Sequence, residues 1–141
     1  MISKMIKTDI IIIGAGPVGL FAVFEAGLLN MKCHLIDVLP KPGGQCIELY
    51  PKKPIYDIPA YPEILAGDLI KNLLKQCSQF EPGFTLGERA EKFEKLKDGN
   101  FLITTDKGTR HCAPVVAIAG GLGGFQPRKP NFEGLSNYEN K

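Results

Sequence analysis

Residues 9–19 read DIIIIGAGPVG, and this stretch decides the fold. Its four consecutive isoleucines form a β-branched run of the kind that fills a parallel strand buried on both faces. A glycine-rich turn follows, and then an apolar segment that begins at Pro17, where proline is tolerated in the first turn of a helix. We therefore expect a strand over 9–13, a helix over 17–30 and a second strand over 33–38. Together these elements make one βαβ unit.

The turn carries the pattern G-x-G-x-x-G, which is typical of a dinucleotide-binding loop. Gly14 permits the tight turn, Gly16 leaves space for a pyrophosphate against the backbone, and Gly19 allows the helix to pack closely on the strand. The helix that opens at Pro17 offers free N–H groups and a favourable dipole to phosphate. A glycine-rich turn that binds nothing is the alternative, and the position of the pattern between a strand and a helix disfavours it.

The second strand ends on an acidic residue, Asp37, which lies 18 residues after Gly19 (37 − 19). The dinucleotide fingerprint places a carboxylate about 20 residues on, where it accepts hydrogen bonds from ribose hydroxyls. Because a carboxylate repels a 2′-phosphate, this position suits FAD or NAD and disfavours NADP. An exposed aspartate at the end of a strand is the plainer alternative.

Segment 40–62 contains six prolines and the pair Gly43-Gly44. We expect no helix there, because proline interrupts helical hydrogen bonding, and we expect an ordered loop with a functional role. Beyond it the periodicity predicts a helix over 67–80. Strands are expected over 85–87, 92–96, 101–105, 109–112 and 115–119, and the middle three form an antiparallel meander with turns at 98–99 and 106–108.

Bulk composition excludes several classes of protein. The formal net charge of the 141 residues is +2, too small to indicate binding to nucleic acid or to a membrane surface. The apolar run at 10–13 is too short for a signal peptide or a membrane span. Four widely spaced cysteines favour reduced thiols in a cytoplasmic protein.

The motifs resemble a known group of flavoproteins. Residues 14–19, Asp37 and the PGGQ of residues 42–45 resemble the FAD domain of the thioredoxin-reductase-like flavoproteins. Residues 43–59 (GGQCIELYPKKPIYDIP) resemble more narrowly the thioredoxin-reductase-like ferredoxin–NADP(+) reductases. Residues 119–128 (AGGLGGFQPR) match the end of that family's first FAD segment. The resemblance covers nearly the whole chain and implies an α/β fold: a Rossmann-like FAD-binding domain with a parallel sheet, flanking helices and an antiparallel β-meander.

The resemblance also implies FAD as a cofactor and a set of residues that bind it: Gly14, Gly16, Pro17, Gly19, Asp37, Gly44, Gln45, Tyr50, Ala90 and Phe125. Asp37 would bind the adenosine ribose, and Ala90 would meet the adenine through its backbone. Gln45 and Tyr50 would lie along the flavin, with Phe125 near the isoalloxazine. Tyr50 and Phe125 could instead be ordinary core aromatics. We expect no catalytic acid or base and no metal site, because the flavin carries the redox chemistry.

The activity that the resemblance implies is electron transfer between NADPH and ferredoxin, or a similar acidic carrier, through FAD. Residues 1–128 would be the first segment of the FAD domain and residues 129–141 a linker toward an NADPH domain that the chain lacks. The family also implies a homodimer. Two alternatives stay open, a thioredoxin-reductase-type disulfide reductase and an inactive truncated FAD-binding fragment. A C-x-x-x-x-C dithiol is excluded, because Pro51 stands five residues after Cys46.

Overall fold

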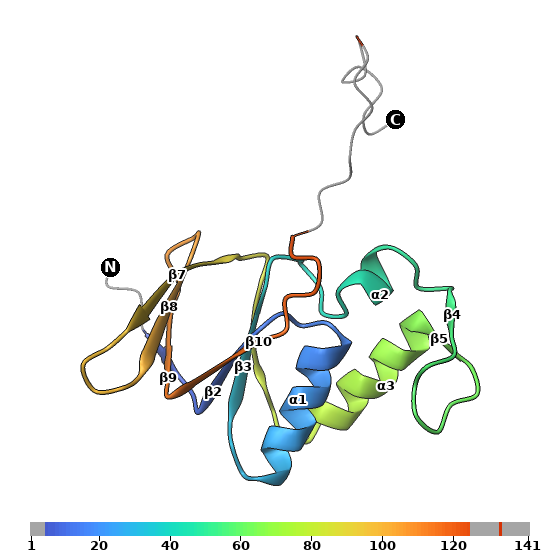
Figure 1. The fold of residues 1–141 in the computed structure, drawn as a ribbon, viewed down its shortest axis with the longest axis horizontal. Coiled ribbons are helices and arrows are strands. Elements are labelled where there is room, and N and C mark those ends of the chain that lie inside the picture. Colours follow the sequence, from blue (N-terminus) through green and yellow to red (C-terminus); the bar gives the residue numbers. More distant parts are fainter. Residues whose placement is uncertain (1–4, 125–132, 134–141) are drawn as a thin grey trace.

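The computed structural model describes residues 5–124 and residue 133. The described part has three layers, with a parallel sheet in the middle, two helices on one face and an antiparallel sheet on the other (Figure 1). The predicted α/β class with a Rossmann-like arrangement is confirmed. Both faces of the central sheet are therefore covered, as a continuous β-branched strand requires.

The central sheet has the strand order β10-β2-β3-β6, and all its pairings are parallel. The strands are β2 (Ile10–Ile13), β3 (Cys33–Asp37), β6 (Gly83–Leu86) and β10 (Val115–Ile118). Ile11, Ile12 and Leu35 have no exposed surface at all. The predicted strands over 9–13, 33–38, 85–87 and 115–119 are confirmed, with ends shifted by one or two residues.

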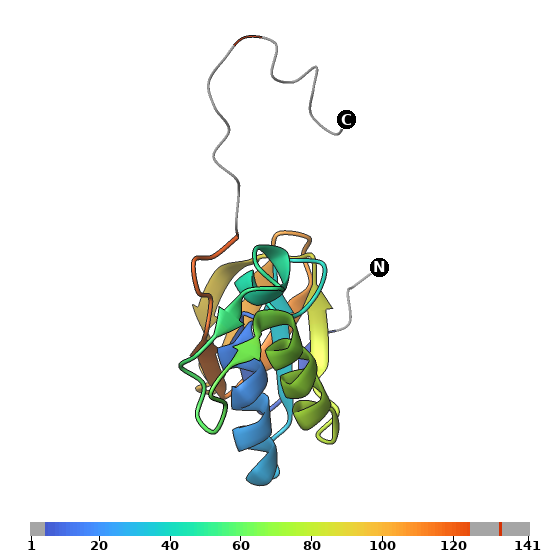
Figure 2. The same ribbon diagram turned by 90° about the vertical axis from the view of Figure 1, so that its right-hand side faces the viewer.

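Two helices lie side by side on one face of this sheet (Figure 2). They are α1 (Pro17–Leu28) and α3 (Ala66–Ser78). Leu20, Val23 and Ile70 pack with Ile12 and Leu35 in the larger core, between helices and sheet. The helix expected over 17–30 ends a little early, and Asn30 adopts the left-handed conformation that terminates helices (φ 58°).

The opposite face is covered by the meander, whose strands are β7 (Ala90–Lys95), β8 (Phe101–Thr105) and β9 (Arg110–Ala113). This confirms the predicted hairpins. A short strand that the sequence did not indicate, β1 (Ile6–Lys7), pairs in parallel with β9. A smaller core of Ile11, Ile36, Ile103 and Ala113 joins the two sheets.

The expectation that segment 40–62 holds no helix is wrong at one place. Residues 43–50 contain no proline, and one helical turn, α2 (Gln45–Glu48), forms there. Farther on, β4 (Pro54–Ile55) pairs with β5 (Ile64–Leu65). The backbone N–H of Gly43 donates to the carbonyl of Ala15 at 2.8 Å, which brings the segment onto the glycine-rich turn.

Among the helices of residues 5–124, none combines the length and the apolar character needed to cross a bilayer.

Candidate cofactor-binding site

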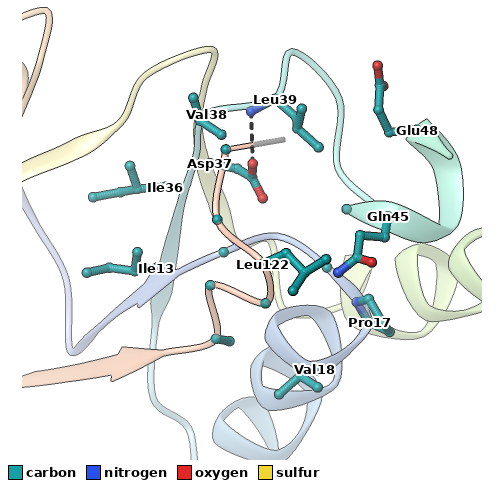
Figure 3. Close-up of a pocket in the computed structure, with 18 of the residues that line it drawn as sticks. Ile13, Pro17, Val18, Ile36, Asp37, Val38, Leu39, Gln45, Glu48 and Leu122 are labelled. Carbon is teal, nitrogen blue, oxygen red and sulfur yellow. Dashed lines mark hydrogen bonds between the residues drawn. The ribbon is translucent and has the colours of Figure 1, made fainter. Parts of the chain in front are cut away.

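A cleft of about 630 Å³ opens where β2, β3 and β10 end (Figure 3). Its walls come from five segments: the turn before α1, the end of β3, the start of α2, the turn before β7 and the glycine-rich residues after β10. Ligands of parallel α/β sheets bind beyond the carboxyl ends of the strands. The cleft therefore occupies the position that the βαβ unit predicts for a dinucleotide.

The three glycines of the turn have different surroundings. Gly14 has a φ of +110°, and a Cβ there would overlap the carbonyl oxygen of Ala119. At Gly16 a Cβ would find only the Cα of Gly44, 4.0 Å away, so the space beside this backbone is open. Gly19 does not line the cleft, and a Cβ there would overlap the carbonyl oxygen of Gly14. Of the three, only Gly16 has open space where a side chain would stand, and a phosphate could occupy that space.

Helix α1 directs its amino terminus at this space. Gly16 is the N-cap, with no side-chain hydrogen bond to the first turn, and Pro17 follows as the first helical residue. The N–H groups of the first turn have no intrahelical acceptor. Together with the positive end of the helix dipole, they favour an anion in the cleft.

The carboxylate of Asp37 holds two backbone segments at the edge of the cleft. Its Oδ2 accepts a hydrogen bond from the N–H of Ala15 at 2.6 Å. Its Oδ1 accepts one from the N–H of Leu39 at 2.9 Å (Figure 3). Each carboxylate oxygen has a second lone pair. Asp37 can therefore receive a ribose hydroxyl while it also fixes the glycine-rich turn, and the sequence did not indicate this second role.

The wall opposite the turn is formed by the start of α2. Gly44 has a φ of +55°, and a Cβ there would lie 3.2 Å from the Cα of Gly16. The two glycines leave a narrow slot bounded by backbone. Gln45 and Tyr50 also line the cleft, and the ammonium group of Lys53 lies 5.2 Å from the centroid of the Tyr50 ring.

Most of the predicted site residues meet at this one place. Eight of them line the cleft: Gly14, Gly16, Pro17, Asp37, Gly44, Gln45, Tyr50 and Ala90. Gly19 lies behind the turn, and Phe125 lies outside the described residues. Their roles toward a cofactor stay predictions.

The cleft also has lining residues that the sequence did not assign to the site. Residues 120–124 follow β10, and the side chain of Leu122, 76% exposed, points toward Pro17 and Gln45 (Figure 3). A glycine run directly after an apolar strand was the available signal. Glu88 and Arg89 also line the cleft, and they carried no such signal, because their placement depends on β6 pairing with β3.

A second cleft of about 920 Å³ adjoins the first. It shares Pro17, Val18, Cys46 and Tyr50 with the first cleft, so the ring of Tyr50 lies on the boundary between them. Most of the rest of its lining is apolar, and it includes three aromatic residues, Phe21, Tyr56 and Tyr61. The surface beyond the slot is thus markedly apolar.

Thiol chemistry has no support in this site. All four cysteines are free and buried, and burial raises the pKa of the Cys46 thiol, the only one at the cleft. A raised pKa disfavours the reactive thiolate. Within the part of the chain that the structure describes, no three potential ligands gather in a way that could hold a metal ion.

These layers define a Rossmann-like α/β fold, and the cleft lies where such folds bind dinucleotides. The fold is similar to that of thioredoxin reductase from Streptococcus pyogenes MGAS5005, with a TM-score of 0.70 and 24% identity over 89% of this chain and 38% of that one. It is also similar to that of cyclohexanone monooxygenase, with a TM-score of 0.71 and 23% identity over 96% of this chain and 30% of that one. Because both identities are below 25%, the similarity is evidence for the fold alone.

Sequence similarity is more specific. The chain is 72% identical over 137 residues to ferredoxin–NADP reductase 2 of Christiangramia forsetii, covering 97% of this chain and 39% of that protein. It is 69% identical to ferredoxin–NADP reductase of Flavobacterium johnsoniae, with the same coverage, and 57% identical to that of Mesorhizobium japonicum, covering 97% and 40%. The resemblance to the ferredoxin–NADP(+) reductases is confirmed. The chain spans about 39% of the length of the first two relatives. No protein-family model matches it.

Proposed function

We propose that the chain is the FAD-binding part of an oxidoreductase that transfers electrons between NADPH and ferredoxin, or a similar acidic carrier. The supporting observation is identity of 53–72% over nearly the whole chain to parts of proteins named ferredoxin–NADP reductase. The proposal includes a cytoplasmic homodimer, with residues 1–128 as the first FAD segment and 129–141 as a linker toward an NADPH domain.

The cleft fits FAD in three respects. The backbone slot between Gly16 and Gly44, at the amino terminus of α1, suits a pyrophosphate. Asp37 stands where the adenosine ribose is expected. The apolar surface on both sides of Tyr50 suits a flat ring system.

The role of the chain's own residues would be to bind and orient the cofactor. Bound FAD would accept a hydride and release single electrons, and this chemistry belongs to the cofactor. Gly16 and Gly44 admit the diphosphate by having no side chains. Asp37 keeps the turn in place through the N–H of Ala15. Nothing in this arrangement requires a proton-transferring side chain.

Titration of the 141-residue chain with flavins tests the proposal. We expect FAD to bind, with a change in flavin absorbance and fluorescence, and FMN to bind far more weakly because it lacks the adenosine half that Asp37 would contact. Equal affinity for FAD and FMN, or no affinity for either, would contradict it.

Asp37→Ala is expected to weaken FAD binding by about 1.5–3 kcal/mol, the value of a hydrogen bond to a charged group. The variant also leaves the N–H of Ala15 without its acceptor, so the free energy of unfolding of the apo chain must be measured alongside. Asp37→Asn is the matched control, because it keeps the shape and one acceptor oxygen. An unchanged dissociation constant in Asp37→Ala would show that the carboxylate does not touch the ribose.

A further prediction concerns the proposed acidic electron carrier, and it applies to the longer protein that the proposal implies. Lys53 lies beside Tyr50, and Lys52 precedes it in the chain. Cations near a flavin steer acidic carriers and raise their association rate. Lys52→Glu with Lys53→Glu should slow ferredoxin reduction at low salt and leave flavin reduction by NADPH nearly unchanged.

The matched control for this pair is Lys92→Glu with Lys95→Glu on β7, which belongs to the antiparallel sheet. High salt should reduce the difference between the first pair and the native protein, because screening shortens the reach of the charges. Equal rates for both charge-reversed pairs at low salt would contradict steering by Lys52 and Lys53.

A disulfide reductase is the other enzyme class considered. The four free, buried cysteines provide no dithiol for it in this chain. Parallel assays of disulfide reduction and ferredoxin reduction in the longer protein distinguish the two, and a chain that binds FAD without any turnover would be the inactive fragment.

A further inference from the structure

The only two histidines of the chain meet on one threonine between the two sheets. Nε2 of His34, on β3, lies 2.8 Å from Oγ1 of Thr85 on β6, and that oxygen lies 2.9 Å from Nε2 of His111 on β9. The ring centroids are 4.9 Å apart. We call these three residues the histidine bridge, because it joins the central sheet to the meander by side-chain hydrogen bonds.

The protons of the bridge can be assigned from its geometry. A threonine hydroxyl carries one proton, so it donates to one imidazole and accepts from the other. Nδ1 of His111 is buried without a partner, and a proton there would be an unsatisfied donor. His111 therefore carries its proton on Nε2 and donates to Thr85, and Thr85 donates to Nε2 of His34. This arrangement requires both imidazoles to be neutral.

A fourth residue, Gly83, leaves room for the ring of His34. A Cβ at Gly83 would overlap Nδ1 of His34, so the absence of a side chain at Gly83 makes room for the imidazole. His34 is 9% exposed and His111 is fully buried. The pair is thus held in an interior with little freedom to turn toward water.

The surroundings offer little that would stabilise an imidazolium. The residues paired with His34 on β2 and β6 are Ile11 and Gly83, and those paired with His111 on β1 and β8 are Ile6 and Ile103. None of these four ionises.

Among residues 5–124, the carboxylate of Glu88 is the one group whose charge favours a protonated His111. Its Oε2 already accepts a hydrogen bond from the hydroxyl of Thr105 at 2.6 Å. The positive charge of Lys107 in turn stabilises the ionised form of Glu88. The charged residues on β1 and β9 are Lys7 and Arg110, and both are exposed. Burial, and then the charge of His111, lower the pKa of His34 to about 4, and burial lowers that of His111 despite Glu88.

The bridge lies directly beneath one end of the cofactor cleft. Two residues after Thr85, the N–H of Gly87 donates to the carbonyl of Leu39 at 3.0 Å, and that of Glu88 donates to the carbonyl of Asp37 at 3.1 Å. Glu88 lines the cleft. Movement of β6 relative to β9 would therefore reach the wall that carries Asp37.

We propose that the histidine bridge is an acid-sensitive contact between the two sheets, closed while both imidazoles are neutral and opened when either is protonated. A proton on His34 would present two Nε2–H donors to Thr85 and leave the hydroxyl proton without its acceptor. The proposal concerns the chain's own fold and holds whichever cofactor occupies the cleft.

The free energy of unfolding should therefore fall over a defined range of acidic pH. Both imidazoles titrate near pH 6.5 when the chain is unfolded. Below that pH the unfolded state therefore binds protons that the folded state does not bind. The stabilisation is complete above about pH 6.5 and is lost as the pH falls toward about 4.

NMR of the native 141-residue chain tests the bridge without any substitution. Only two imidazoles contribute, and their nitrogen shifts should show one Nε2–H and one Nδ1–H tautomer, with neither ring titrating between pH 7.5 and 5. A folded-state midpoint near 6.5 for either ring, or two identical tautomers, would overturn the proposal.

Unfolding by urea at several pH values provides the second measurement. The double variant His34→Gln with His111→Gln keeps a polar group at each ε position and cannot titrate. Near pH 5 the stability of the native chain should change more steeply with pH than that of the variant, by about two protons. Equal slopes would overturn the proposal.

Hydrogen exchange locates the opening. After correction for intrinsic rates, amides of β9 and β6 should exchange faster at pH 5 than at pH 7.5, while those of α1 should change little. Thr85→Val, which lacks the hydroxyl, should show the faster exchange of β9 and β6 already at pH 7.5. Thr85→Ser, which keeps the hydroxyl, should exchange as slowly as the native chain at that pH. A uniform change over all elements would show global unfolding and overturn a local contact.

Discussion

Gly16→Val is expected to abolish flavin binding and to leave the fold intact. The backbone of Gly16 is extended (φ −75°, ψ −173°), a conformation open to any residue. A Cβ there meets no atom closer than the Cα of Gly44 at 4.0 Å, so the side chain would project into the slot without overlapping the protein. The methyl groups of valine would then occupy the space proposed for the pyrophosphate.

The effect should exceed that of Asp37→Ala, because steric exclusion removes the diphosphate together with everything attached to it. We expect the dissociation constant for FAD to rise by a factor of about 1000 or more, equivalent to about 4.2 kcal/mol. The free energy of unfolding of the apo chain should fall by no more than about 1 kcal/mol, the effect of a poorer N-cap residue. Fluorescence titration and urea unfolding measure the two quantities.

Ser78→Val is the matched control, because it places the same side chain at an exposed position of α3 outside both clefts. Gly16→Ala should give an intermediate loss of affinity, since one methyl group intrudes less than three carbons. Full flavin occupancy in Gly16→Val would show that the cofactor does not pass between Gly16 and Gly44. The assignment of the glycine-rich turn would then be wrong.

The sequence predicted those parts of the fold that rest on local chemistry. The isoleucine run of β2, the glycine spacing after it and Asp37 at the end of β3 are short-range signals, and they placed one βαβ unit correctly. Their meeting in one cleft also follows from the sequence, because parallel strands bring their carboxyl ends to one edge of a sheet.

Features that depend on tertiary pairing could not be predicted in this way. Strand β1 has two residues and no period of its own, and it exists because β9 offers it an edge. The turn of α2 was hidden by the prolines on either side, although Gly43 fixes it through the carbonyl of Ala15. Glu88 reaches the cleft only through the pairing of β6 with β3.

The histidines illustrate the same limit at the level of side chains. His34 and His111 fall within the strands expected over 33–38 and 109–112, far apart in the chain. Their meeting on Thr85 requires the stacking of two sheets, which no local pattern encodes. The hydrogen bonds that Asp37 accepts from the N–H groups of Ala15 and Leu39 likewise depend on how the chain folds, although the residue itself was predicted for the site.

Gly19→Ala is expected to destabilise the fold strongly, although it adds a single methyl group. In an exposed helix position the same change stabilises by about 1 kcal/mol. Here a Cβ would overlap the carbonyl oxygen of Gly14 and lie 3.3 Å from Cγ2 of Ile12. The obstacle is backbone at the end of β2, which cannot move without disturbing the turn and the central strand. We expect a loss of about 3 kcal/mol in the free energy of unfolding, at the upper end of the range for overpacking.

Gly27→Ala is the matched control on the same helix. A Cβ there would overlap the ring of Phe80, and a side chain can move where backbone cannot, so the loss should be clearly smaller than at Gly19. Urea unfolding of both variants gives the comparison. Because Gly19 does not line the cleft, Gly19→Ala should lose FAD only in proportion to its unfolded fraction, the reverse of the pattern expected for Gly16→Val. A stable Gly19→Ala chain would mean that α1 does not approach β2 as closely as the turn geometry requires, and the narrow slot between Gly16 and Gly44 would be in error with it.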